Sequence, residues 1–273
     1  MTGLEKREKD SPDEKPGLVD SHAHLDMEDF DADREETIRR AFDAGIRSIL
    51  CPADLTSPQS LQTTLELSAR NPNIRAAAGI HPHQAKFFKP ETLLQARELV
   101  SSKKISALGE IGLDYHYDFS PPEAQRNAFR AQLNLAQELS LPVIIHSRKA
   151  GPEVAAAVKG EGLTRGGILH CFTEDWNLAR AMLDCGFFIS FSGILTYPGA
   201  QSLRDIARKI PLERLLVETD SPYLVPSPFR GTQKRNEPAF VVATAKVLAD
   251  LKKIAFEELA GVTSHNFYSL FSK

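Results

Sequence analysis

The chain is poor in cysteine, and its few thiols are not spaced for structural use. It has three cysteines in 273 residues, and Cys51, Cys171 and Cys185 show no C-x-x-C spacing. This odd, scattered set argues against a disulfide framework and against a zinc knuckle built on paired cysteines. Unpaired thiols are typical of a reducing compartment, so we expect the protein in the cytoplasm, the nucleus or both.

Long hydrophobic runs are also missing. No stretch of the sequence reaches the ~18 apolar residues of a membrane-spanning helix, so no membrane partner is predicted. Residues 1–17 are rich in charges of both signs and lack the apolar core of a signal peptide. We expect this segment to be a disordered charged arm, and residues 18–273 to form one domain.

The sequence has no large excess of charge and no glycine-rich dinucleotide fingerprint. The formal net charge is −3, so the molecule as a whole is not a general trap for polyanions. Binding to nucleic acid would need a local basic patch. The missing fingerprint argues against an open, doubly wound nucleotide-binding sheet.

Eight short apolar runs alternate with longer segments of helical periodicity. The runs span residues 18–25, 48–53, 75–82, 105–114, 141–148, 166–172, 187–193 and 215–222. Several are apolar at almost every position, as in strands buried on both faces of a parallel sheet. Between them, Ser57-Pro58 and Asn71-Pro72 bound one helix, and Ser120 with Glu123 and Thr173 are expected to cap two others. Eight strand–helix units predict an α/β fold, a single (β/α)8 TIM barrel.

Histidines and acidic residues stand at the carboxyl ends of six of these runs. They are His22, His24, His81, Glu110, His146, His170 and Asp220. The carboxyl ends of barrel strands meet around one axis, so these side chains are expected to converge. Imidazoles and carboxylates suit zinc or manganese, and carboxylates also accept magnesium. Leaving His81 aside, six ligands are too many for one tetrahedral ion and predict two divalent ions with one carboxylate between them.

Several motifs carry a resemblance to a known family. They are "DSHAHLD", "GIHPH", "GEIGLDYH", "LPVIIHSR", "LHCF", "ETDSPYL" and "RNEP". In this order and spacing the chain resembles the TatD family of metal-dependent deoxyribonucleases, within the amidohydrolase-like superfamily. The resemblance implies a distorted TIM barrel with two divalent ions. It implies that His22, His24 and Asp220 hold one ion, that Glu110 bridges, and that His146 and His170 hold the other.

The resemblance and the ligand types together predict a deoxyribonuclease. Its two ions would activate a water molecule for hydrolysis of a DNA phosphodiester bond, at a strand end or at a damaged site. Asp220 is expected to accept the proton of that water, and Glu110 completes the catalytic pair. After "HCF" the family usually continues with Ser-Gly, whereas this chain has Thr173-Glu174, a difference that bears on substrate fit.

Basic residues near the same strand ends predict contacts with phosphate. Arg148 lies two positions after His146, and the proline-rich stretch 221–238 carries Arg230, Lys234 and Arg235. His81 is expected to contact substrate at the mouth. Three aromatic residues, Phe119, Tyr223 and Phe229, are candidates for stacking on an unpaired base.

Two other classes of function fit parts of the sequence. The same metals would serve the hydrolysis of a small amide, lactone or ester, because a fold does not determine its chemistry. A non-catalytic nucleic-acid or scaffold protein with a relict barrel is the third class, and the complete ligand set argues against it. A monomer is the default expectation.

Overall fold

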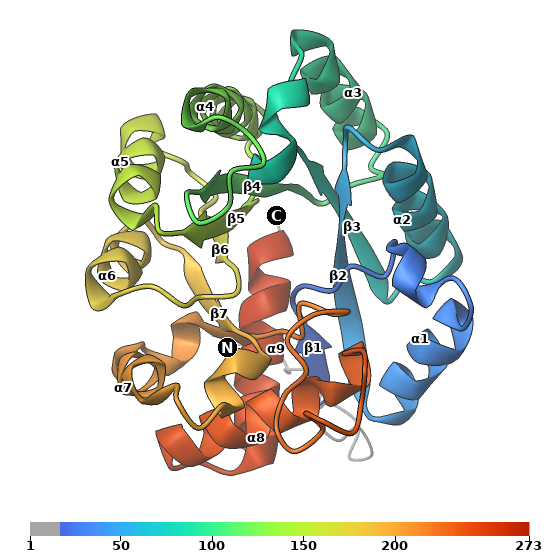
Figure 1. Cartoon of the computed structure of the whole chain (residues 1–273), viewed down its shortest axis with the longest axis vertical. Coiled ribbons are helices and arrows are strands. Elements are labelled where there is room, and N and C mark those ends of the chain that lie inside the picture. The colour runs from blue at the N-terminus through green and yellow to red at the C-terminus, as the bar shows by residue number, and fades with distance from the viewer. Residues whose placement is uncertain (1–16, 273) are drawn as a thin grey trace, which may run out of the picture.

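The computed structural model describes residues 17–272, and almost all of the predicted arm at 1–17 lies outside them. Eight parallel strands form one sheet in which each strand pairs with the next along the chain (Figure 1). The strands are β1 (Leu18–Asp20), β2 (Ile46–Asp54), β3 (Ile74–Gly79), β4 (Ala107–Asp114), β5 (Val143–Arg148), β6 (Gly167–Leu169), β7 (Phe188–Phe191) and β8 (Leu215–Val217).

A helix follows every strand and lies on the outside of the sheet, as Figure 1 shows. These helices are α1 (Arg34–Asp43), α2 (Pro58–Arg70), α3 (Pro90–Ser101), α4 (Pro122–Leu139), α5 (Gly151–Glu161), α6 (Trp176–Asp184), α7 (Gln201–Lys209) and α8 (Val241–Lys252). A further helix, α9 (Phe256–Phe271), ends the described chain. The predicted (β/α)8 barrel is therefore confirmed. None of the helices within residues 17–272 is both long enough and apolar enough to cross a bilayer.

The interior of the barrel is a packed core that α9 closes. One buried residue from each strand contributes to it, and these are Val19, Leu50, Ala77, Ala107, Ile144, Ile168, Phe188 and Leu216. They pack with Phe267 and Leu270 of α9, and Figure 1 shows α9 in the middle of the ring of strands. In each strand that carries a candidate metal ligand, the core residue precedes that ligand in sequence. The floor formed by α9 therefore lies at the amino-terminal end of the barrel, and the carboxyl end stays open.

Irregular segments, instead of a strand ladder, join the first strand to the last. In the part of the chain that the structure describes, regular pairing stops at β8. Beyond it, the Asp220 amide donates to the His22 carbonyl (2.9 Å) and the His24 amide donates to the Ser221 carbonyl (2.8 Å). The buried Asp20 carboxylate accepts hydrogen bonds from the Thr219 amide (2.9 Å) and hydroxyl (2.6 Å). The residues that close the barrel are thus the neighbours of three predicted metal ligands.

The predicted helix caps are partly confirmed. Ser57 accepts a hydrogen bond from the Ser60 amide and begins α2, which ends at Asn71 as expected. The prediction for Ser120 is wrong, because its hydroxyl donates to the His83 carbonyl (2.7 Å) and so ties two loops together. Thr173 is also wrong, because Asp175 caps α6 two residues later.

We expect the bonds between Asp20 and Thr219 to stabilise the closed barrel. Burial raises the pKa of Asp20 to about 8, so the group is largely neutral at neutral pH. Thr219→Val leaves this buried acceptor without its hydroxyl partner, and we expect it to lower the free energy of unfolding by ~1–3 kcal/mol. The matched control is Thr244→Val, since the Thr244 hydroxyl is buried without a hydrogen-bond partner. The control is expected to leave stability unchanged or to raise it. Urea unfolding in the presence of chelator measures both, and equal effects would contradict this role for Thr219.

Candidate metal centre

The predicted metal ligands converge at the open end of the barrel. The six ligands are His22, His24, Glu110, His146, His170 and Asp220, and they come from five strands or the residues directly after them. His81, which follows β3, lies with them. The expectation that Glu110 ends its strand is wrong, because it lies in the middle of β4. The register between β4 and β5 shifts between Leu108 and Ile111. An extra residue of this kind redirects side chains, which explains how a mid-strand residue reaches the mouth.

One oxygen of the buried Glu110 carboxylate faces three imidazoles. Oε1 lies 2.7 Å from Nε2 of His170, 3.0 Å from Nδ1 of His146 and 3.2 Å from Nε2 of His81. The nitrogens of His146 and His170 are themselves 3.3 Å apart. His81, expected from the sequence to contact substrate, is therefore a member of the cluster, grouped with Glu110 and His146.

The other oxygen of Glu110 faces a second group. Oε2 lies 3.2 Å from Nε2 of His22 and 3.6 Å from Nε2 of His24. Oδ1 of Asp220 is 3.8 Å from His22 Nε2 and 3.6 Å from His24 Nε2. The two imidazole nitrogens are 3.1 Å apart. Glu110 thus separates two sets of nitrogen and oxygen donors and contacts both.

These spacings suit donors around a common cation. Two ligands that are each ~2.1 Å from a zinc ion at a tetrahedral angle lie roughly 3.4 Å apart. Within each of three groups, the ligand atoms lie within 4.8 Å of one another. The groups are His22–Glu110–His170, His22–His24–Asp220 and His81–Glu110–His146. The residues present therefore fit a divalent metal.

The buried histidines differ in protonation. Burial lowers the pKa of His22 to about 4 and that of His81 to about 4, so both rings are neutral at neutral pH. Neutral imidazole is the form that binds metal. Burial opposes protonation of His146 and His170, but their carboxylate partners outweigh it and raise the pKa of both rings, so a bound metal would have to displace those protons. Burial opposes ionisation of Glu110, but the surrounding imidazoles, His170 foremost, outweigh it and hold its pKa well below the usual value. Burial raises the pKa of Asp220 to about 6.

Two further carboxylates stand behind the imidazoles. Oδ2 of Asp114, at the end of β4, lies 3.2 Å from His146 Nε2 and 2.8 Å from His83 Nε2. Oε1 of Glu218 lies 3.4 Å from His170 Nδ1. Such outer carboxylates orient a ligating imidazole and fix its tautomer. The role of Asp114 was not predicted, although a carboxylate four residues after Glu110 was a visible signal.

The four basic residues predicted to contact phosphate differ in their contacts within the chain. The guanidinium of Arg148 lies 4.8 Å from the ring centroid of Tyr117, and that of Arg230 lies 4.2 Å from that of Tyr197. Lys234 is exposed. Arg235 points elsewhere, since its guanidinium is bound by both oxygens of one carboxylate, Asp33, at 2.7 and 2.9 Å. Because this guanidinium is already paired within the chain, it is not available for a phosphate contact.

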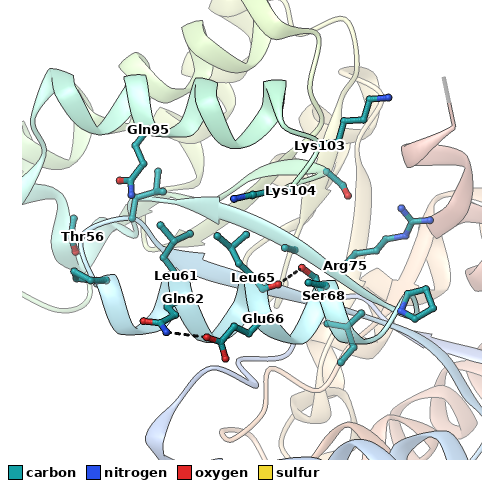
Figure 2. Close-up of a pocket in the computed structure, with 17 residues that line it drawn as sticks. Thr56, Leu61, Gln62, Leu65, Glu66, Ser68, Arg75, Gln95, Lys103 and Lys104 are labelled. Carbon is teal, nitrogen blue, oxygen red and sulfur yellow. Dashed lines mark hydrogen bonds between the residues drawn. The ribbon is translucent and has the colours of Figure 1, made fainter.

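A separate groove lies on the outer wall of the barrel, between α2 and α3 (Figure 2). Leu61 and Leu65 of α2 line it together with Lys104, as Figure 2 shows. None of the clustered histidines or their carboxylate partners lines this groove. It therefore has no part in the chemistry of the metal centre.

We expect the Glu110 carboxylate to be essential for metal binding. Glu110→Gln replaces the shared anion with a neutral amide, and should weaken binding of divalent metal by at least ~100-fold. The metal content of the purified protein, measured by mass spectrometry after dialysis, checks this. Glu66→Gln on the exposed face of α2 is the control and should keep its metal. An unchanged far-ultraviolet circular dichroism spectrum would show that the fold persists, and full metal content in Glu110→Gln would contradict the assignment.

Comparison with known proteins identifies the family. A model of the TatD related DNase family matches residues 19–272. The uncharacterized metal-dependent hydrolase YabD of Bacillus subtilis is 42% identical over 255 residues, covering 93% of this chain and 98% of that protein. The 3'-5' ssDNA/RNA exonuclease TatD of Erwinia tasmaniensis is 36% identical over 260 residues, covering 93% and 100%. The crystal structure of YjjV, a TatD homologue from Escherichia coli, superimposes with a TM-score of 0.86 at 32% identity, covering 93% and 97%. The chain thus belongs to the TatD family and is a metal-dependent hydrolase.

Proposed function

We propose that this protein is a nuclease that hydrolyses DNA phosphodiester bonds with two divalent ions, zinc, magnesium or manganese. The observation that carries the proposal is the position of Glu110, whose two oxygens face two different donor groups. His22, His24 and Asp220 would hold one ion, and His81, His146 and His170 would hold the other. When bound, such ions polarise phosphoryl oxygens and lower the pKa of a bound water toward ~7.

Asp220 is the residue of this chain best placed to accept the proton of the attacking water. Its side chain is 15% exposed, against 5% for Glu110, so it reaches further toward the open mouth. Its backbone is fixed, because the Asp220 amide donates to the His22 carbonyl at 2.9 Å. Oδ1 of Asp220 therefore keeps its place beside His24 while a proton is transferred.

Cations at the mouth support a phosphate substrate over a small carbonyl compound. Arg148 follows the β5 ligand His146 by two positions, and Arg230 and Lys234 lie exposed in the segment after β8. Cations beside a metal pair suit a phosphate backbone. The relative from Erwinia tasmaniensis, named an exonuclease on single-stranded DNA and RNA, supports the same substrate class.

Digestion of end-labelled single-stranded DNA tests this function. We expect hydrolysis with added divalent metal and none with chelator. Asp220→Asn should lower kcat by about 10²–10⁴-fold, because it removes both a ligand and the proton acceptor. Asp250→Asn, on the exposed face of α8, is the control and should keep full activity. If only lactone or amide compounds were turned over in a parallel panel, the nuclease proposal would be wrong.

The salt dependence of DNA binding tests the basic residues. Each phosphate contact on a single strand contributes about 0.7 to the slope of log K against log salt concentration. Arg148→Ala and Lys234→Ala should each weaken binding and flatten the slope by about that amount. Lys159→Ala is the control, since Lys159 is exposed in the last turn of α5, away from the mouth. A slope identical to the wild type would remove the residue from the phosphate contacts.

A further inference from the structure

Three large aromatic side chains are exposed around the metal centre. Tyr117 is 43% exposed, Phe119 is 52% exposed and Tyr223 is 50% exposed. Ring faces open to water beside a polar site often mark a binding surface. The first two belong to the loop between β4 and α4 and lie beside His83, whereas the third follows β8 and lies beside His24.

Tyr117 and Phe119 form one surface, which we call the platform. Their rings are stacked, with centroids 5.3 Å apart and planes inclined by 30°. Both rings contact the ring of His83, with centroids 5.6 and 4.7 Å away. The guanidinium of Arg148 lies over the Tyr117 ring at 4.8 Å. The platform thus presents two rings that are about half exposed, with a cation over one of them.

The platform is connected through Asp114 to His146, one of the candidate metal ligands. The Tyr117 amide donates to Oδ1 of Asp114 at 3.1 Å. Oδ2 of the same carboxylate contacts His83 at 2.8 Å and His146 at 3.2 Å. One carboxylate therefore fixes the platform, the histidine beneath it and a candidate metal ligand together.

Tyr223 stands beside the other half of the centre. Its ring centroid lies 6.5 Å from that of His24. Its amide donates to the Asp220 carbonyl at 3.0 Å, and its carbonyl accepts from the side chain of Asn236 at 2.6 Å. The phenol is thus presented by a fixed backbone next to the residue that we propose as proton acceptor.

From this arrangement we infer that the platform and Tyr223 clamp the two bases on either side of the scissile phosphate. The inference rests on the proposed nuclease function and adds residues that select the substrate. Stacking on an aromatic face is open to every base, but only when the base is unpaired. The clamp therefore selects unpaired nucleotides, of either sugar type and of any sequence, and places the phosphate between them at the metal centre. Arg148 beside the platform pairs with the neighbouring phosphate.

Abasic oligonucleotides test the clamp. We would measure binding of a fluorescein-labelled single-stranded decamer by anisotropy, using the Asp220→Asn protein to prevent cleavage and saturating manganese to offset the weaker metal binding of this variant. Removing the two bases at the cleaved end should raise Kd by roughly 5- to 150-fold per base, the range for loss of one stacked base. The double variant Tyr117→Ala/Phe119→Ala should raise Kd for the intact strand by a similar factor, and should lose sensitivity to one of the two abasic positions. Tyr223→Ala should lose sensitivity to the other.

Conservative and distant variants complete the design. Tyr117→Phe and Phe119→Tyr keep a ring at each position and should bind like the wild type. Tyr268→Ala removes a partly exposed ring from α9, at the closed end of the barrel, and should leave binding unchanged. If the alanine variants bind the intact strand like the wild type, or still discriminate against both abasic positions, the clamp is refuted.

Steady-state cleavage by the wild-type holoenzyme separates this inference from the function on which it rests. Cleavage with KM raised by the abasic positions, and kcat changed less, supports both. Cleavage whose KM is the same with and without the two bases overturns the clamp and leaves the nuclease function standing. Base-dependent binding without any cleavage overturns the nuclease function and leaves the stacking surfaces standing.

Discussion

The site depends on one buried carboxylate whose charged and polar contacts, in the part of the chain that the structure describes, are all imidazoles. Glu110 contacts the nitrogens of five imidazoles at 2.7–3.6 Å, and no arginine or lysine is among its contacts in residues 17–272. A buried charge must be compensated, because its loss of hydration is costly. Two of the rings, His22 and His81, are held neutral by burial. His170 compensates part of the charge, because Glu110 outweighs burial and raises the pKa of His170 well above its ordinary value. A bound divalent cation would replace that proton as the compensating charge.

The barrel architecture brings the candidate metal ligands together around Glu110. Parallel strands present the residues after their carboxyl ends to a common centre. The irregular segments that join β1 to β8 carry His22, His24 and Asp220. The backbone contacts that close the sheet therefore also hold these three side chains close to one another. Asp114 and Glu218 face the ring nitrogens of His146 and His170 that point away from Glu110.

Much of this could be predicted from the sequence, because the apolar periodicity encodes the strands and their order encodes the barrel. The seven residues at the strand ends were found in the same way. The rotation of a side chain about its strand is not encoded locally, so the sequence does not predict that His81 faces Glu110. A register shift likewise depends on the neighbouring strand, so the sequence of β4 alone does not predict that Glu110 lies in the middle of the strand. Arg235 looked available because its partner Asp33 lies 202 residues away.

The floor made by α9 has a consequence for how a polymer can be handled. Because Phe267 and Leu270 fill the far end of the barrel, a nucleic acid strand has no tunnel through which to thread. For the proposed nuclease, substrate would enter and product would leave through the same open end. A strand that is not threaded through the protein could dissociate after each cut without first being unthreaded.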